Sequence, residues 1–321
     1  MKKLTIGIVV AMLLIAIFPL GAAAAETLIP GGQLIGLELR DGSVTVAGFE
    51  QSQAEKLQKA GLAVGDRIVQ INGKHVKDVL DIRNALTSEK TVKVVIQREG
   101  KNHTLELTPT NTPQGLRLGV YLRRGISGVG TVSWYDPDTG KFGTLGHGVN
   151  DCNGNLSSLT TGNAYPARII TVKKGCSGQP GQLMGGIESQ KPFGVLTANT
   201  TRGVFGTTET PFSGEPLPVA SAEEIHTGKA VIRSTVDEKG VQEYSVEILK
   251  IYPKSKGNGR NLLLKVTDKA LLETTGGIVQ GMSGSPIIQN GKLIGAVTHV
   301  LVNDPTTGYG IFIENMLDAA A

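Results

Sequence analysis

Gly281-Met282-Ser283-Gly284-Ser285-Pro286 is the stretch that decides the fold and the chemistry expected of this 321-residue chain. It leads into an apolar run over residues 287–297, which is interrupted by Asn290-Gly291. Because Asn-Gly between apolar runs favours a two-residue turn, the pattern predicts a serine on a tight turn at the entrance of a β-hairpin. Glycines beside this serine would let the backbone N–H groups of Gly281 and Ser283 converge, as an oxyanion hole requires.

A glycine-flanked histidine lies upstream, in the segment Gly143-Thr144-Leu145-Gly146-His147-Gly148. A serine hydroxyl is a weak nucleophile until a neighbouring base accepts its proton. The two segments together favour a serine hydrolase, with Ser283 as the nucleophile and His147 as the base. An ordinary Gly/Ser turn is the structural alternative. Ser285 is the alternative nucleophile, although its place before Pro286 favours a role in the turn.

An acidic residue should orient the histidine and stabilise its charged form. Asp268 stands at the end of a predicted strand, fifteen residues before Ser283, and is the leading candidate. Its alternative role is a helix cap. His299 follows the serine hairpin closely, and we interpret it as a strand histidine in or near the core. Weaker contexts surround the remaining candidate acids and histidines, which are Asp151, Asp304, His75, His103 and His226.

The composition predicts a mainly β protein, because 43 glycines and only 4% aromatic residues indicate many turns and short strands. A net charge of +4 without a basic cluster gives nucleic-acid binding little support. No pair of histidines or cysteines has the spacing of metal ligands, so we expect neither a metal nor a cofactor.

The first 25 residues have the character of a secretory signal or a membrane anchor. Lys2-Lys3 is followed by an apolar stretch over residues 4–18 and by the small-residue run Ala22-Ala23-Ala24-Ala25. A charged start, an apolar stretch and a small-residue exit are typical of export. We therefore expect the rest of the chain to lie outside the cytoplasm, where a disulfide between Cys152 and Cys176 could form.

The segment from about residue 33 to residue 110 has the pattern of one small module. It contains Ala60-Gly61-Leu62, then Gly65-Asp66 and Ile71-Asn72-Gly73, and this phrase resembles a PDZ domain. PDZ domains add an extended peptide to a sheet edge and receive its carboxylate on backbone amides. The resemblance implies a peptide-binding loop made by Gly32, Gln33, Leu34, Ile35, Gly36 and Leu37. A purely structural or autoinhibitory module remains the alternative.

From residue 116 onward, short strands broken by Gly and Pro favour a barrel or a sandwich. The predicted organisation is therefore a signal or anchor at residues 1–25, a PDZ domain at residues 26–110 and a peptidase domain at residues 111–321.

The two glycine-framed segments, with Val-Thr-Asp at 266–268 and the sequence of residues 278–310, resemble the stage IV sporulation protein B peptidase family. The order of apolar segment, PDZ domain and serine peptidase domain agrees with that family as well. The resemblance implies a chymotrypsin-like double β-barrel with His147 as the base, Ser283 as the nucleophile and Asp268 as the acid.

The family resemblance also implies a biological role. Such proteins are exported from the forespore into the space between forespore and mother cell, either anchored or released, and cleave themselves near the N-terminus. They then cleave a membrane-bound regulator, which releases an intramembrane protease and so activates a late sporulation sigma factor. The expected partners are therefore the chain itself and that regulator. Only residues 26–32 separate the apolar start from the predicted PDZ domain here, which leaves the self-cleavage position open.

Two other functions compete with this one. Envelope quality-control peptidases also combine PDZ and chymotrypsin-like domains, but they place the peptidase domain first, whereas this chain places it last. The second alternative is a secreted scaffold that binds peptide ends on an inert peptidase fold. The presence of both His147 and Ser283 argues against the scaffold.

Overall fold

The computed structural model describes residues 26–151, 154–255 and 259–321. The predicted signal or anchor segment, residues 1–25, lies outside this part of the chain, as does Cys152. Cys176 is exposed, and its pairing with Cys152 stays a prediction. Among the described residues, no helix is both long and apolar enough to cross a membrane.

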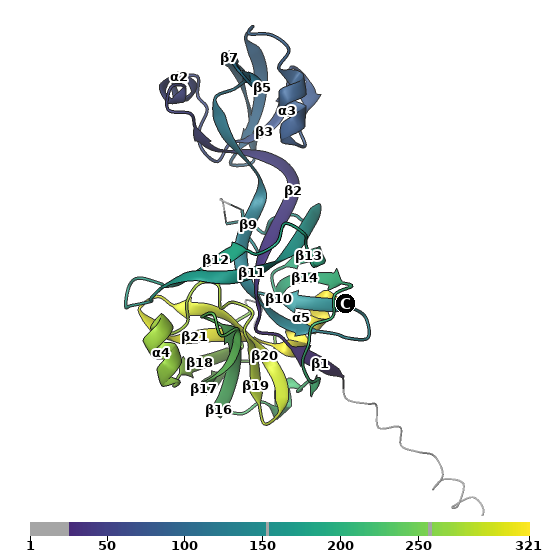
Figure 1. Cartoon of the computed structure of the whole chain (residues 1–321), viewed down its shortest axis with the longest axis vertical. Coiled ribbons are helices and arrows are strands. Elements are labelled where there is room, and N and C mark those ends of the chain that lie inside the picture. Colours follow the sequence, from purple (N-terminus) through teal and green to yellow (C-terminus); the bar gives the residue numbers. More distant parts are fainter. Residues whose placement is uncertain (1–25, 152–153, 256–258) are drawn as a thin grey trace, which may run out of the picture.

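The protein is mainly β, and its lower body in Figure 1 is built from two antiparallel barrels. In the first barrel, each strand pairs with the next and the last pairs with the first. Its strands, in that order, are β2 (Leu34–Phe49), β9 (Val120–Tyr135), β10 (Lys141–Thr144), β14 (Gly203–Thr208), β13 (Gly194–Thr200) and β11 (Thr161–Lys173).

Three shorter strands extend this first barrel. β1 (Thr27–Pro30) pairs with both β9 and β15 (Leu217–Pro218), and β12 (Gln182–Ile187) forms a hairpin with β11. Leu28 and Ile29 of β1 are buried, so the chain enters the folded body at once after residue 26. The 3₁₀ turn η1 (Ala222–Glu224) lies between the two barrels along the chain.

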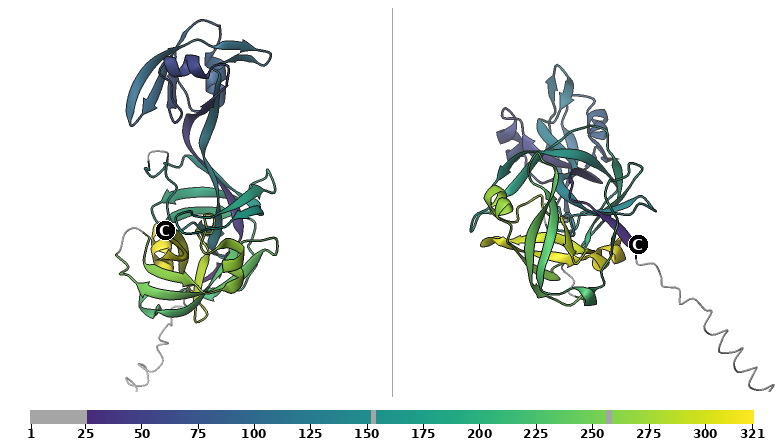
Figure 2. Two further views of the ribbon diagram at one scale, coloured as in Figure 1. Left: turned by 90° about the vertical axis from the view of Figure 1, so that its left-hand side faces the viewer. Right: turned by 60° about the horizontal axis from the view of Figure 1, so that its bottom comes forward.

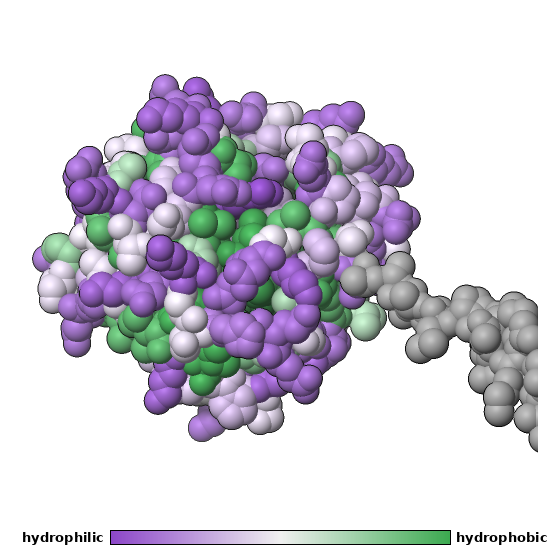
Figure 3. All heavy atoms as spheres, turned by 90° about the horizontal axis from the view of Figure 1, so that it is seen from below, coloured by the Kyte–Doolittle hydropathy of each residue, from purple (hydrophilic) through white to green (hydrophobic). Residues whose placement is uncertain are grey.

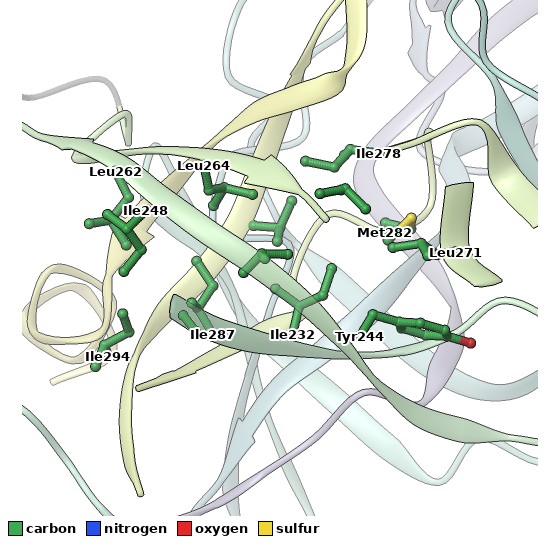
Figure 4. Close-up of a cluster of buried hydrophobic side chains, with 14 of the residues drawn as sticks. Ile232, Tyr244, Ile248, Leu262, Leu264, Leu271, Ile278, Met282, Ile287 and Ile294 are labelled. Atoms are coloured by element: carbon green, nitrogen blue, oxygen red, sulfur yellow. The ribbon is translucent and has the colours of Figure 1, made fainter. Parts of the chain in front are cut away.

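The second barrel is closed by β16 (Gly228–Thr235), β17 (Val241–Ile251), β18 (Leu262–Val266), β21 (Asp304–Phe312), β20 (Lys292–Leu301) and β19 (Pro286–Gln289). Its interior is filled by branched aliphatic side chains, among them Ile232, Ile248, Leu264 and Ile287 (Figure 4). Alternate residues of these strands point inward, as half-buried antiparallel strands require. The helices α4 (Lys269–Thr275) and α5 (Ile313–Ala320) belong to this half of the chain.

The predicted hairpin at Asn290-Gly291 is confirmed. Gln289 pairs with Lys292, and both turn residues have positive φ, +50° for Asn290 and +73° for Gly291. Two consecutive left-handed residues are the requirement of a type I′ turn, and Asn-Gly meets it with little strain. The turn therefore sets the register of β19 and β20, which frame the serine segment.

The small module at the top of Figure 1 has its own hydrophobic core, formed by residues between Val44 and Leu122. Asp66 is buried in it and forms an ion pair with Arg98, the Asp66 Oδ1 to Arg98 Nε distance being 2.7 Å. Its elements are α2 (Ala54–Lys59), β3 (Arg67–Ile71), β4 (Lys74–His75), α3 (Val79–Ala85), β5 (Val92–Arg98), β6 (Lys101–Leu107), β7 (Thr110–Thr112) and β8 (Gly115–Arg117).

A two-stranded ribbon joins this module to the first barrel. The long strands β2 and β9 pair from Leu34 and Thr131 to Phe49 and Val120, with a register shift between Leu39 and Val44, and run from the body into the module (Figures 1 and 2). The first half of β2 pairs with β11, and its second half pairs with β3. The small module is thus inserted between two barrel strands.

This topology corrects the predicted position of the peptide-binding loop. Gly32 to Leu37 belong to the first barrel, where Ile35 and Leu37 pack in the core with Val132. The sequence pattern identified these residues as strand-forming, but alternation does not reveal which of two cores buries a strand. For the same reason, residues 26–39 belong structurally to the barrel, and Val120 and Leu122 at the start of β9 pack with the small module, although the sequence placed the domain boundary at residue 110.

The exterior differs in character from these cores. Seen from below, hydrophilic side chains cover most of the surface, and hydrophobic side chains occupy smaller areas between them (Figure 3). This face is therefore mainly polar, in contrast to the barrel interiors, which are filled by apolar side chains.

Candidate active site

Ser283 lies on the turn between α4 and β19, in the second barrel's half of the chain. The glycines around it are required by geometry, because Gly281 and Gly284 have φ of +99° and +98°. A Cβ atom on Gly284 would lie 2.6 Å from the backbone nitrogen of Leu145. The glycine therefore allows the serine turn to touch the loop that carries His147.

His147 follows β10 of the first barrel. Leu145 and Gly146, which precede it, both have left-handed backbones, with φ of +68° and +67°. A Cβ on Gly146 would lie 2.8 Å from the Thr298 methyl group and 3.0 Å from an Ile311 methyl group. The glycine thus lets the loop pack closely on β20 and β21. This contact brings the histidine of the first barrel into the same cleft as Ser283.

The hydrogen bonding of His147 suits a general base. Its Nδ1 lies 2.9 Å from the carbonyl oxygen of Gly148. Since a carbonyl only accepts, Nδ1 carries the proton, and Nε2 of the neutral ring is left to accept one. Burial lowers the pKa of His147 below its usual value, although the Gly148 carbonyl opposes this effect. The ring is therefore neutral, and able to accept a proton, at neutral pH.

The Ser283 hydroxyl does not point at His147 in this structure. Its Oγ donates a hydrogen bond to the carbonyl oxygen of Thr298, at 2.8 Å. Rotation of the serine side chain is therefore needed before a proton can pass to the histidine. Ser285, the alternative nucleophile, is fully buried and donates to the hydroxyl of Ser234 at 3.0 Å, so it stabilises the turn.

Two backbone N–H groups near the serine have no acceptor among the described residues. They are those of Gly281 and Ser283, whereas the N–H groups of Met282 and Gly284 donate to Val279 and Val297. This arrangement leaves free the two donors that the sequence motif predicted for an oxyanion hole.

His299 also lines the cleft that holds His147 and Ser283, whereas the sequence had suggested only a strand histidine in or near the core. Its ring centroid lies 5.2 Å from that of His147, and its Nδ1 is buried without a partner among the described residues. Burial, then the proximity of His147 and of Arg260, lowers the pKa of His299 to about 4. The ring is accordingly neutral at neutral pH. The β19–β20 hairpin returns the chain to the serine turn, so a histidine sixteen residues after the serine comes back beside it.

Asp268 is not brought to His147. It caps the N-terminus of α4, where its carboxylate accepts hydrogen bonds from the backbone nitrogens of Leu271 at 3.0 Å and Ser245 at 3.4 Å. These contacts are those of a helix cap, which was the alternative role considered for Asp268. The carbonyl of Gly148 occupies the place at Nδ1 that an acid would take.

Sequence reasoning missed Asn199, which supports the histidine loop. Its side-chain oxygen accepts from the Val149 nitrogen at 2.9 Å, and its side-chain nitrogen donates to the carbonyls of Val149 and Ser157 at 2.8 and 2.7 Å. Val149 is two residues from His147, so Asn199 holds the loop from beneath. An asparagine late in a strand carries no local signal of this contact.

The cleft around the two residues has a volume of about 460 Å³ and is mostly apolar. No carboxylate or lysine lines it among the described residues, and within the same part of the chain no cluster of acidic, histidine or cysteine side chains could hold a metal. The apolar lining includes Leu37, Leu39, Ile126, Val129, Ile278 and Val300.

Comparisons with known proteins give partial matches to several enzymes. A Staphylococcus aureus (strain N315) protein named as a zinc metalloprotease is 34% identical over 84 residues, which is 26% of this chain. The chain spans about a fifth of the length of the curated relatives it matches, 20% in this case.

Two solved structures are similar over larger parts of the chain. The active form of the Mycobacterium tuberculosis protease Rv3671c is 16% identical, with a TM-score of 0.37, over 61% of this chain and 73% of that one. The HtrA-type protease AlgW with a decapeptide is 12% identical, with a TM-score of 0.38, over 67% and 59%. Because these scores are low, the fold description rests on the strand pairings given above.

The family comparison is decisive. Residues 54–98 match the PDZ domain family, in agreement with the inserted module. Residues 114–317, more than half of the chain, match the family described as SpoIVB peptidase S55, and this range contains both His147 and Ser283. This protein therefore contains a PDZ domain and belongs to the SpoIVB peptidase S55 family.

Proposed function

We propose that this protein is an exported, self-cleaving peptidase that triggers a late step of sporulation by cleaving a membrane-bound regulator. Membership in the SpoIVB peptidase S55 family supports the role. The observation that carries the chemical part is the single cleft in which the two barrels present His147 and Ser283. In this proposal, loss of the regulator frees an intramembrane protease, which activates a late sigma factor.

The proposed reaction begins with rotation of the Ser283 hydroxyl away from the Thr298 carbonyl and toward His147. His147 Nε2 takes the hydroxyl proton while Oγ attacks the substrate carbonyl, and the ring later returns the proton to the leaving amine. The N–H groups of Gly281 and Ser283 stabilise the tetrahedral oxyanion. The Gly148 carbonyl keeps His147 in the required tautomer, the task usually performed by an acid.

The substrate class follows from the lining of the cleft. Its apolar walls, without a charged pair to match a charged side chain, favour apolar side chains beside the scissile bond. We therefore expect a sequence that is extended and apolar at the cleavage point.

The position of self-cleavage is constrained by β1. Leu28 is buried, and β1 pairs with β9 and β15, so a cut within Thr27–Pro30 would remove a strand from the body. We place the self-cleavage site before Thr27. Such a cut would release the folded body from the apolar segment at residues 1–25 and leave both barrels intact.

The PDZ domain is proposed to hold substrate or partner peptides. A groove of about 270 Å³ lies between α3 and β9, lined by Val79, Ile82 and Leu86 on one side and by Val120 and Leu122 on the other. In this stretch β9 pairs with β2 alone among the described strands, which leaves one edge for an added peptide strand. This groove replaces residues 32–37 as the expected peptide site.

The groove can be tested with two neighbouring residues of α3. Val79→Glu puts a charge into the groove and should weaken processing of the natural target, while cleavage of a short unstructured peptide stays nearly unchanged. Leu80, which is 59% exposed and outside the groove, provides the matched control Leu80→Glu. Equal loss on both substrates would mean that the groove is needed by the peptidase itself and does not deliver substrate.

The function as a whole is tested in sporulating cells of the organism that encodes the chain. Ser283→Ala should leave the protein unprocessed on immunoblots and abolish expression from a reporter that depends on the late sigma factor. Ser285→Ala, two residues away, is the matched control and should keep processing and expression. Normal reporter expression with Ser283→Ala would refute the sporulation role, and retained self-processing would move the nucleophile elsewhere.

A further inference from the structure

Thr131, on β9, lies where the two barrels meet, and it is completely buried. Its backbone nitrogen donates to the carbonyl oxygen of Ser283 at 3.0 Å. Its hydroxyl donates to the carbonyl oxygen of Gly281 at 2.8 Å. One residue of the first barrel therefore holds the carbonyls of both residues whose N–H groups form the proposed oxyanion hole.

These two hydrogen bonds restrict the orientation of the serine turn. A peptide plane is rigid, so the two bonds fix the planes that join Gly281 to Met282 and Ser283 to Gly284. The N–H groups of Gly281 and Ser283 lie in the preceding planes, and these fixed neighbours limit how far those planes can rotate. Gly281 has a positive φ and no side chain of its own to hold it, and glycine rotates between backbone regions at little cost. Without the Thr131 hydroxyl, the carbonyl of Gly281 would be buried without that partner and free to turn away.

The same residue contacts the histidine side of the site. The Thr144 hydroxyl donates to the Thr131 carbonyl oxygen at 2.6 Å, and Thr144 precedes His147 by three residues. A Cβ on Gly284 would lie only 2.0 Å from that same carbonyl oxygen. The serine turn and the histidine loop are thus both held against Thr131.

We propose that Thr131 is a positioning residue, whose hydroxyl holds the Gly281 carbonyl so that the N–H groups of Gly281 and Ser283 stay directed at the reacting carbonyl. The proposal rests on the proposed serine peptidase chemistry but not on the sporulation role. Thr131 touches neither substrate nor the reacting atoms, and it acts through the two oxyanion residues. Its contribution should consequently be found in the chemical step and not in peptide binding.

The test uses the full chain and a fluorophosphonate probe, which reacts with an activated serine and needs no knowledge of the natural substrate. Thr131→Val keeps the size of the side chain and removes the hydroxyl. It should lower the limiting labelling rate by about 10- to 100-fold, below the effect of deleting an oxyanion donor outright, and leave the half-saturating probe concentration unchanged. Thr131→Ser, which restores the hydroxyl, should recover the rate to within a few-fold.

A matched control lies two residues along the same strand. Ser133 is also completely buried, but its hydroxyl has no hydrogen-bond partner among the described residues. Ser133→Ala should therefore label at the normal rate. Trp134 fluorescence verifies folding of each variant, and Thr131→Ala replaces the valine variant if that one does not fold.

Each result has one meaning. Normal labelling of both Thr131→Val and Thr131→Ala would overturn the proposal, and so would failure of Thr131→Ser to recover the rate. A change confined to the half-saturating concentration would also overturn it, because that would indicate a role in binding. Absence of labelling in the unsubstituted protein would instead refute the serine chemistry of the proposed function.

Discussion

His299 makes the stability of the peptidase domain depend on pH. Its side chain lies half-buried on β20 beside His147, with Arg260 nearby, and these surroundings lower its pKa from 6.5 to about 4. In the unfolded chain the ring titrates near its ordinary value. Above pH 6.5 the ring is neutral in both states, and its contribution to stability is fully present. As the pH falls from 6.5 to 4, the unfolded chain binds the proton first, and this contribution is lost.

The magnitude follows from the size of the shift. A lowering from 6.5 to about 4, at about 1.36 kcal/mol per pKa unit, corresponds to about 3 kcal/mol as an upper limit. The ring is partly exposed, so solvent screening reduces this figure, and we expect about 1–2 kcal/mol. His299→Gln keeps a polar side chain of similar reach but removes the titration. The unfolding free energy of the protein with His299 should thus fall by about 1–2 kcal/mol more than that of the variant between pH 7.5 and 4.5.

Urea unfolding measured by tryptophan fluorescence is the appropriate assay. Trp134 is the single tryptophan, is 2% exposed and packs near Phe205 in the peptidase domain, so its emission does not report on the PDZ domain. Both proteins carry Ser283→Ala to prevent self-digestion. His147 is present in both, and its own lowered pKa therefore largely cancels in the comparison. A difference between the two proteins that is the same at both pH values would refute the reasoning.

Three further outcomes are expected. Asp268→Ala should lower the free energy of unfolding by about 1 kcal/mol, because the cap of α4 is lost, and Asp268→Asn should lower it by less. Both variants should keep most of kcat/KM. A collapse of kcat/KM with unchanged stability would restore the acid role of Asp268. Gly284→Ala should abolish activity and destabilise the peptidase domain by more than about 2 kcal/mol, because the alanine Cβ would lie 2.0 Å from the backbone oxygen of Thr131. A near-normal urea midpoint would contradict this expectation. In the pH dependence of kcat/KM, the loss of activity toward acid pH should have its midpoint below pH 6.5, since burial lowers the pKa of His147. A midpoint above pH 6.5 would count against His147 as the base.

Local chemistry explains which features could be predicted from the sequence. The Asn290-Gly291 turn requires two left-handed residues, and the glycines around Ser283 and His147 are required by close backbone contacts, so each is visible as a sequence pattern. Asp268 was ambiguous because an aspartate at a strand end can serve either as an acid or as a helix cap, and only the position of His147 decides between them. The PDZ phrase was visible because Gly65-Asp66 and Asn72-Gly73 form tight turns within the module.

Other features depend on contacts between distant parts of the chain. Thr131 bonds to a residue 150 positions away, and Asn199 holds a loop 50 positions away. Neither residue stands in a pattern that a single sequence could identify. The placement of residues 32–37 failed for a related reason, because a strand of alternating residues can be buried equally well in either core.

The insertion of the PDZ domain between β2 and β9 also affects how the peptidase folds. Leu39 pairs with Ile126, so residues 40–125 form a loop that must close before the first barrel can be completed. In an unfolded state, a loop of this length costs about 2–3 kcal/mol more to close than a turn of a few residues. Once the PDZ domain has folded, it holds β2 and β9 side by side, so the barrel can close without the entropy cost of the long loop. Mutations in the PDZ core, far from Ser283, can therefore reduce activity by slowing or weakening barrel closure, without any change in peptide recognition.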